Sequence, residues 1–227
     1  KVIWPIICNE LEKREIDKEL VYLAHSFERV MPGIGYYDSL VNYWRVYAGR
    51  TSGAADVCEE FLSTLINVEQ YPLKRLASMT ASEATKVLEN SYRAVNIAFI
   101  DEWTKYSELI GIDLYEIVDA VRVRPTHSNI RSPGLGVGGY CLTKDPLFAL
   151  ASLSGLFNID GPEFVFSKMA IEVNQQMPLH AVHRLSNLMN NELEKKNILI
   201  MGVSYKGDIG DSRFSPSELL VQTLRER

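Results

Sequence analysis

TASEATKVLENSYRAVNIAFIDEWTKYSEL, residues 80–109, is the stretch of sequence that decides the fold. It lies between Pro72 and Gly111, in a run that holds no Pro or Gly. Its start, Thr80 to Glu83, has the T-x-x-E pattern of a capping box, which satisfies free N–H groups at a helix start. Apolar residues then recur with the helical period, at Ala84, Val87, Leu88, Tyr92, Val95, Phe99, Trp103 and Tyr106. We expect one helix of about 30 residues, roughly 45 Å long at 1.5 Å per residue, that crosses the molecule or packs against a second copy.

The residues before this helix predict the end of an α/β sheet domain. Residues 2–16 carry a helical apolar stripe, and residues 54–66 are predicted to be helical as well. Two segments, 21–26 and 43–49, are rich in β-branched and aromatic residues and are predicted as strands. Strands that alternate with helices are typical of an α/β sheet.

The residues after the long helix predict shorter helices and then a second α/β unit. Helices are predicted at 113–123, 145–155 and 162–176 and again after Pro178. A long Gly- and Pro-rich loop, 124–146, separates the first two, and loops of that length are usually functional or disordered. NILIMGV, 197–203, has the pattern of a buried strand, and Ser215-Pro216 is typical of a helix start with Pro in first position.

Composition excludes several classes of protein. The chain has 227 residues, of which 46% are hydrophobic and 23% charged, which is an ordinary globular balance. Its net charge of -5 argues against a nucleic-acid partner, because phosphate binding needs a basic surface. No apolar run approaches the roughly 20 residues of a membrane span. The chain opens on KVIWPIICNE, without an initiator Met or a signal peptide, and we interpret it as a fragment of a longer protein.

The three cysteines differ in their surroundings. An odd number without a C-x-x-C motif argues against disulfides and zinc, and predicts a reducing, cytoplasmic location. Cys8 and Cys58 lie among apolar residues and are expected to be small buried hydrophobes. Cys141 lies instead on the loop GLGVGGYCLTKDP, 134–146, followed by Lys144 and by Asp145. We predict a reactive nucleophile there rather than a plain flexible turn.

Glycines and two helical polar residues complete the candidate chemistry. The loop glycines lack the Cβ atoms that keep main-chain amides away from an anionic ligand; they are Gly134, Gly136, Gly138 and Gly139. Lys86 and Asn90 lie four apart on the long helix and share one face, which Arg93 extends. That face is either solvated or aimed at a developing oxyanion. His180 and His183 have no third metal ligand at a suitable spacing, so we expect surface histidines and no metal site.

Three motifs in this order resemble the UDP-glucose/GDP-mannose dehydrogenase family of nucleotide-sugar 6-dehydrogenases: ASEATKVLENSYRAVNIAFIDEW, GLGVGGYCLTKDP and ILIMGVSYKGDIGDSRFSP. The resemblance implies an α/β fold with a mainly helical central domain. It places the end of an N-terminal Rossmann, NAD-binding domain at 1–72 and a central domain, which dimerises through the long helix (80–110), at 73–178. The start of a Rossmann-like UDP-sugar-binding domain falls at 179–227. The G-x-G-x-x-G fingerprint for NAD is absent, so we expect the fragment itself to bind NAD poorly and to be inactive.

The resemblance also implies a reaction and a set of residues. Such enzymes oxidise the sugar's 6-hydroxymethyl to a carboxylate in two NAD-dependent steps, through a cysteine thiohemiacetal and thioester. Cys141 occupies the nucleophile position, and Lys86 with Asn90 match the K-x-x-x-N pair that is suited to stabilising the alkoxide and the water. Asp145 matches the acid that assists hydrolysis. A positive Lys86 favours thiolate and oxyanion, and a carboxylate takes a proton from water.

Further positions match the family's motifs. Lys206 matches a lysine that lines the site, and Arg213 an arginine near the cofactor. Glu28 matches the glutamate of a P-E-x loop, although Phe27 stands where proline is usual. The loop glycines are expected to bring main-chain amides to the sugar or diphosphate.

The sugar itself is less sharply indicated. FERVMPG, 27–33, resembles the ERV-x-PG loop of the branch that oxidises UDP-N-acetylhexosamines, and Pro32 stands where the UDP-glucose branch has a second glutamate. Tyr140 replaces a histidine that is usual in the former branch, and the L-T-K-D run is closer to the UDP-glucose branch. We favour a UDP-N-acetylhexosamine, in polysaccharide-precursor synthesis, with UDP-glucose and GDP-mannose as alternatives.

Two other functions stay open. One is a dehydrogenase of the β-hydroxyacid or 6-phosphogluconate type, which also uses a lysine and an asparagine on a long helix but oxidises once, without a cysteine. The other is a non-catalytic dimerisation module. Two NADH per sugar separate the favoured function from the first, and a natural chain that begins near Lys1 favours the second.

Overall fold

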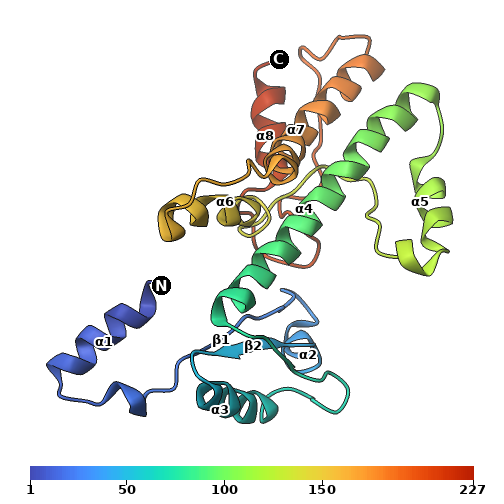
Figure 1. The fold of residues 1–227 in the computed structure, drawn as a ribbon. Coiled ribbons are helices and arrows are strands. Elements are labelled where there is room, and N and C mark those ends of the chain that lie inside the picture. Colours follow the sequence, from blue (N-terminus) through green and yellow to red (C-terminus); the bar gives the residue numbers. More distant parts are fainter. The chain divides into compact units, whose positions relative to one another are not determined.

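The computed structural model describes residues 1–227 as two compact units, Lys1–Val87 and Leu88–Arg227 (Figure 1). The boundary falls inside the long helix α4, Met79–Ile110, which has 32 residues. The mainly helical character is confirmed, and the sheet has three short strands. The domain boundaries at 72 and 178 stay predictions.

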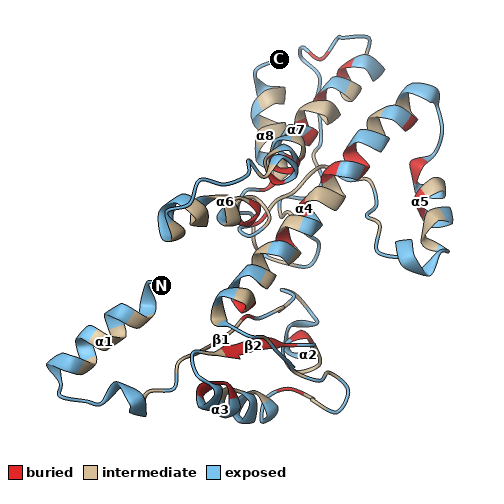
Figure 2. Cartoon of the chain, viewed as in Figure 1, coloured by how far each residue is buried: buried red, intermediate tan, exposed pale blue.

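The first unit is built on a mixed sheet in the order β1-β2-β3, from Ala24–Ser26, Val46–Gly49 and Lys74–Arg75. β1 pairs with β2 in antiparallel fashion and β3 pairs with β2 in parallel fashion. Strand β2 is central, and most of it is buried (Figure 2). Both predicted strands are therefore present but shorter, because the β1–β2 pairing is limited to three residues on each strand.

Helix α3, Ser52–Ser63, packs against the central strand. The Thr51 hydroxyl caps its start by accepting a hydrogen bond from the Ala54 amide, at 3.1 Å. A side chain at Gly49 would overlap the backbone of this first turn, so only glycine allows the strand and the helix to meet so closely. The helix predicted at 54–66 is confirmed, but it starts two residues earlier and ends three residues earlier than predicted.

The remaining helices of this unit are α1, Ile3–Lys13, the short 3-10 turn Lys18–Leu20, and α2, Tyr36–Val41. Cys8 and Cys58 are half-buried, so the prediction of two fully buried thiols is wrong. Helix α1 has no buried residue at all, which leaves Cys8 partly open to solvent. Partial burial and the charge of Glu59 raise the pKa of the Cys58 thiol.

The start of α4 differs from the predicted capping box. The Ser78 hydroxyl accepts a hydrogen bond from the Ala81 amide at 3.1 Å, so Ser78 is the capping residue. Thr80 lies inside the helix instead. The capping box at Thr80–Glu83 is wrong because a serine two positions earlier makes the same type of bond first.

In the second unit, two apolar clusters hold α4 to its neighbours. Ala94 and Ala98 pack against Ala170 of α7, Val165–Leu188, where small side chains let the two helices approach. Ile100 packs against residues of α5, Leu114–Arg122. The helix predicted at 113–123 is thus confirmed.

Helix α7 runs without a break through Pro178, so the prediction of two separate helices is wrong. Proline removes the N–H that would bond the carbonyl of Asn174, four residues earlier. Met177, Pro178 and Val182 are all buried, and this packing offsets the lost hydrogen bond.

The chain between these helices and at its end is less regular. The predicted helix 145–155 is a succession of three short pieces: a 3-10 turn, Asp145–Leu147, helix α6, Phe148–Ser152, and a π-helical turn, Leu153–Phe157. A short 3-10 turn, Pro125–His127, also lies in the preceding loop. Helix α8, Pro216–Arg225, is confirmed, and the Ser215 hydroxyl caps it.

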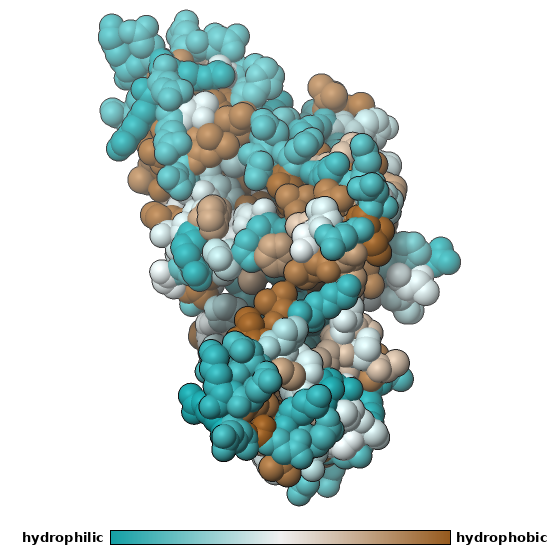
Figure 3. All heavy atoms as spheres, turned by 60° about the vertical axis from the view of Figure 1, so that its left-hand side comes forward, coloured by the Kyte–Doolittle hydropathy of each residue, from teal (hydrophilic) through white to brown (hydrophobic).

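Residues 197–203 do not form the predicted strand. Leu199, Met201 and Val203 are exposed. A strand needs a neighbour to hydrogen-bond its main chain, and within residues 1–227 the only sheet is β1-β2-β3. Other apolar side chains also reach the surface, as Figure 3 shows. None of the helices combines the length and the apolar composition that a membrane span requires.

Candidate active site

In the first unit, Lys86 is directed at the loop that carries Glu28. Its Nζ donates a hydrogen bond to the main-chain carbonyl of Glu28 at 2.9 Å, and lies 4.0 Å from Glu28 Oε1. The same ammonium group is 5.6 Å from the centre of the Phe27 ring. Lys86 is therefore not a freely solvated surface lysine, because its charge is bound to one loop.

A short turn orients the Glu28 side chain. Its Oε2 accepts a hydrogen bond from the Val30 amide, two residues on, while the side chain is largely exposed. Because the ion pair with Lys86 is long and partly solvated, it contributes little to stability. What the contacts fix is the direction of the carboxylate.

In the second unit, Asn90 and Asp145 form a buried pair. Asn90 is 3% exposed and Asp145 is 8% exposed, and Asn90 Nδ2 donates to Asp145 Oδ2 at 2.7 Å. The other carboxylate oxygen accepts a hydrogen bond from Lys144 Nζ, also at 2.7 Å. Each carboxylate oxygen can accept two hydrogen bonds, so a second lone pair stays available for a water.

Cys141 lies at the start of the same turn. Its main-chain carbonyl accepts hydrogen bonds from the amides of Lys144, at 3.2 Å, and Asp145, at 2.9 Å. The Cys141 side chain is exposed. The fold thus joins an accessible thiol to a buried carboxylate through one tight turn, and Asn90 holds that carboxylate from α4.

The loop glycines are packed against protein at three of the four positions, and two of these face the segment before α8. A Cβ at Gly138 would lie 2.8 Å from the Phe214 carbonyl and 2.9 Å from Pro216 Cδ, and the Tyr205 ring fills the space at Gly139. The amide of Gly139 donates to the Arg213 carbonyl at 2.9 Å. The absence of side chains at Gly138 and Gly139 therefore allows the segment before α8 to pack closely against the loop. Nothing lies within 4 Å of a Cβ at Gly134, so only there does the loop leave open space.

The fourth glycine, Gly136, has a positive φ of 104°. A Cβ there would also lie 3.0 Å from Met177 Cβ. Glycine is needed at this position for both reasons.

Arg213 lies against this loop. Its guanidinium pairs with Asp211 through two hydrogen bonds of 2.9 and 2.8 Å and is 5.5 Å from the centre of the Tyr140 ring. Hydrogen bonds from Arg213 lower the pKa of Asp211 to about 2, and the same pair raises the pKa of Arg213. Lys144 Nζ is 4.3 Å from the same ring, so two cations flank Tyr140. Lys206 is exposed, next to Tyr205.

The residues that the sequence singled out thus fall into two sets. Lys86 and Glu28 contact each other in the first unit. Asn90, Asp145, the Cys141 turn and the Arg213 loop are brought together in the second unit. Sequence reasoning missed Lys144 as a partner of Asp145, although its place between Cys141 and Asp145 was a usable signal.

Two further features of the second unit lie outside this set. His180 Nε2 lies 2.7 Å from Glu108 Oε2, and Arg184 lies 3.0 Å from the same oxygen, so His180 is a half-buried partner of a carboxylate rather than a free surface residue. No group of three or more His, Cys, Asp or Glu side chains is arranged to hold a metal.

A cavity of about 500 Å³ lies between α7, α8 and the turn after Cys141. Thr143 and Lys144 are among its lining residues, and Cys141 is not.

Comparison with known proteins is consistent with these motifs. Residues 80–176 match the family model described as UDP-glucose/GDP-mannose dehydrogenase family, central domain. The chain carries the central domain of this family. The resemblance noted in the sequence is therefore confirmed.

Individual proteins also match almost the whole chain. The UDP-N-acetyl-D-mannosamine dehydrogenase of Methanocaldococcus jannaschii is 33% identical over 220 residues, which are 97% of this chain and 48% of that protein. The solved structure of the UDP-D-ManNAc dehydrogenase from Pyrococcus horikoshii has a TM-score of 0.81 at 28% identity, over 98% of this chain and 51% of that one.

A second solved structure is similar at the same identity. The NDP-N-acetyl-D-galactosaminuronic acid dehydrogenase from Methanosarcina mazei has a TM-score of 0.78 at 28% identity, over 93% of this chain and 46% of that one. The chain spans about half the length of the curated relatives it matches.

Proposed function

We propose that the protein carrying this chain oxidises the 6-hydroxymethyl group of a UDP-N-acetylhexosamine to a carboxylate in two NAD-dependent steps. The observation that carries the proposal is the exposed Cys141, whose main chain is bonded to the amide of a buried aspartate that Asn90 holds in place. An accessible thiol beside an oriented carboxylate suits a covalent intermediate that water must later cleave.

Cys141 acts after the first oxidation. Its thiolate attacks the C6 aldehyde, a C–S bond forms, and the carbonyl electron pair moves to oxygen to give the alkoxide of a thiohemiacetal. NAD bound to the whole protein would supply the hydride acceptor for both oxidations. Loss of the second hydride leaves a thioester on Cys141.

Asp145 and Asn90 act in the hydrolysis of that thioester. A free lone pair of Asp145 accepts a proton from water, the water oxygen attacks the acyl carbon, and the C–S bond breaks to return the thiolate. General base catalysis of this kind typically contributes about 10²–10⁴-fold. The amide of Asn90 and the ammonium of Lys144 hold the carboxylate during the step.

The family motifs alone support a part in the reaction for three further residues, Lys86, Glu28 and Lys206. We assign to Lys86 the stabilisation of the alkoxide. Glu28 is assigned to the substrate side and Lys206 to the lining of the site. Gly134 is the loop glycine with open space for a ligand, so we keep it as a substrate contact.

Arg213 is the residue of this chain suited to the cofactor's diphosphate. Its guanidinium is exposed, close to the Cys141 loop, and positively charged. It has to give up part of its pairing with Asp211 to bind a phosphate. Exchange of one anionic partner for another keeps the charge balanced, so the residue fits the role.

The choice of sugar follows the relatives and one loop. The UDP-N-acetyl-D-mannosamine dehydrogenases are among the most similar proteins, at about a third identity. The FERVMPG loop, 27–33, favours the same branch. UDP-glucose and GDP-mannose stay as alternative substrates. The three free cysteines suit a reducing cytoplasm, which we propose as the location.

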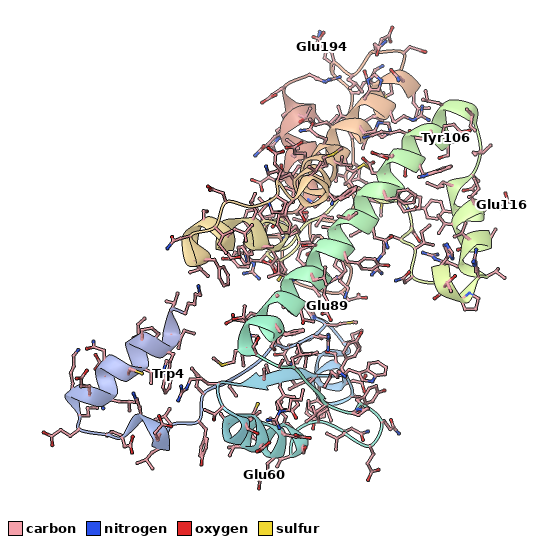
Figure 4. The ribbon with its side chains drawn as sticks, viewed as in Figure 1. Trp4, Glu60, Glu89, Tyr106, Glu116 and Glu194 are labelled. Atoms are coloured by element: carbon pink, nitrogen blue, oxygen red, sulfur yellow. The ribbon has the colours of Figure 1, made fainter.

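We also propose that α4 pairs with α4 of a second copy. Phe99, Trp103 and Tyr106 are exposed, and their rings contact one another along the helix (Figure 4 labels Tyr106). A contiguous aromatic stripe of this kind typically marks a protein interface. The alternative of a non-catalytic dimerisation module uses the same surface without the chemistry.

The test uses the protein with the segments that its relatives have on either side of this chain. It should turn over a UDP-N-acetylhexosamine faster than UDP-glucose or GDP-mannose and release two NADH per sugar. Mass spectrometry should detect an acyl group on Cys141 during turnover. One NADH per sugar contradicts the covalent route, and complete two-step turnover by Cys141→Ala contradicts the nucleophile assignment.

A further inference from the structure

Arg45 is a buried cation next to the Glu28 loop that none of the motifs includes. It precedes strand β2 directly and is 6% exposed. Its Nη1 donates to the Phe27 carbonyl at 3.0 Å, and its Nη2 lies 3.4 Å from the Leu40 carbonyl. Both carbonyls belong to the segment that links β1 to β2.

Burial of this guanidinium is costly. Burial lowers the pKa of Arg45, which the nearby Glu28 partly offsets, and Nε has no hydrogen-bond partner. An apolar side chain of similar size would fill such a space at lower cost. What an apolar side chain cannot do is hold the Phe27 carbonyl.

Two cations donate hydrogen bonds to consecutive carbonyls, one on each side of the Glu28 Cα. Arg45 holds the Phe27 carbonyl and Lys86 holds the Glu28 carbonyl. These oxygens belong to the two planar peptide units that flank the Glu28 Cα. When both planes are held, φ and ψ of Glu28 are fixed, and with them the direction of its Cα–Cβ bond. The hydrogen bond from the Val30 amide to Oε2 then orients the carboxylate.

We propose that Arg45 is a positioning residue, which acts through the main chain to hold Glu28 in its orientation. This rests on the proposed function in one respect: the motifs, not the structure, assign Glu28 to the reaction. The proposal adds the residue directly before β2 to the set that the motifs place on α4 and between β1 and β2.

The first experiment measures hydrogen exchange in the protein with Arg45→Met, Arg45→Lys and, as a control, Arg75→Met. Arg75 lies on the same sheet but pairs with Asp56 of α3. Arg45→Met should speed exchange in 27–33 by about tenfold, as expected for loss of a hydrogen bond from a charged group. Exchange in 52–63 should stay unchanged.

Arg45→Lys should restore part of the protection, because an ammonium can still donate to the Phe27 carbonyl. Arg75→Met should leave 27–33 unchanged. Equal acceleration throughout the first unit, or no change in 27–33, overturns the proposal.

The second experiment measures turnover in the same protein. Arg45→Met should lower kcat, leave KM for NAD unchanged, and add nothing to the loss caused by Glu28→Gln, because both changes act on one group. Additive losses overturn the positioning role. A different result separates the two proposals. If the Glu28→Gln protein has normal turnover while Arg45→Met still speeds exchange in 27–33, Arg45 does position the loop, but the role of Glu28 in the proposed function is wrong.

Discussion

Asn90 and Asp145 are 55 positions apart in sequence and form a buried hydrogen bond of 2.7 Å. Neither residue type was unusual in its local sequence. Only the packing of α4 against the turn after Cys141 makes one the partner of the other. The fold alone thus orients the carboxylate.

We expect Asn90→Ala to cost about 1–3 kcal/mol in the free energy of unfolding, because Asp145 Oδ2 loses its buried donor. Urea denaturation measures this. Asn129→Ala, which removes the same type of side chain from an exposed hydrogen bond to the Tyr92 hydroxyl, is the matched control and should cost less, because both groups can bond to water instead. Equal costs for the two variants contradict the importance of the Asn90–Asp145 bond.

Tyr47 gives a pH-dependent prediction at the same scale. It is fully buried and donates a hydrogen bond to Glu59, and burial followed by that bond raises its pKa to about 12. Because the folded pKa lies above the unfolded value of about 10, the contribution of neutral Tyr47 to stability is complete below pH 10. It is lost as the pH rises toward 12.

Absorbance titration of tyrosinate should therefore show one late tyrosine that Tyr47→Phe removes. The free energy of unfolding of the unchanged protein should fall more steeply between pH 10 and 12 than that of the variant. Coincident slopes contradict the prediction.

At the scale of elements, the start of α4 can be capped by Ser78, as in the structure, or by Thr80, as the sequence pattern predicts. Ser78→Ala should cost about 1 kcal/mol in the free energy of unfolding, the usual value of a helix N-cap. Thr80→Ala should change it much less, because Thr80 lies inside the helix. Thermal or urea unfolding distinguishes them, and the reverse order would restore the capping box at Thr80.

At the scale of the whole molecule, the exposed aromatics of α4 predict self-association. Trp103→Glu should convert a dimer into a monomer in light scattering, because a charge would replace apolar contact at the centre of the stripe. Val123→Glu, an equally polar change at an exposed apolar residue outside α4, should leave the mass unchanged. A monomeric unchanged protein contradicts the proposed pairing.

Local patterns were sufficient for the features that depend on neighbours a few residues away. The long helix follows from apolar periodicity without Pro or Gly, and α8 follows from Ser215 and Pro216. The exposed position of Cys141 follows from its place on a Gly-rich loop. Such features obey rules that act within one or two turns of the chain.

Tertiary packing determines the contacts between segments that are distant in sequence. Burial keeps α7 helical through Pro178, the lack of a neighbouring strand leaves 197–203 exposed, and Arg45 meets the Phe27 carbonyl only because β1 and β2 pair. Hydrogen bonds and burial of this kind depend on which surfaces meet. Spacing along the chain does not encode that meeting, so it becomes visible only in three dimensions.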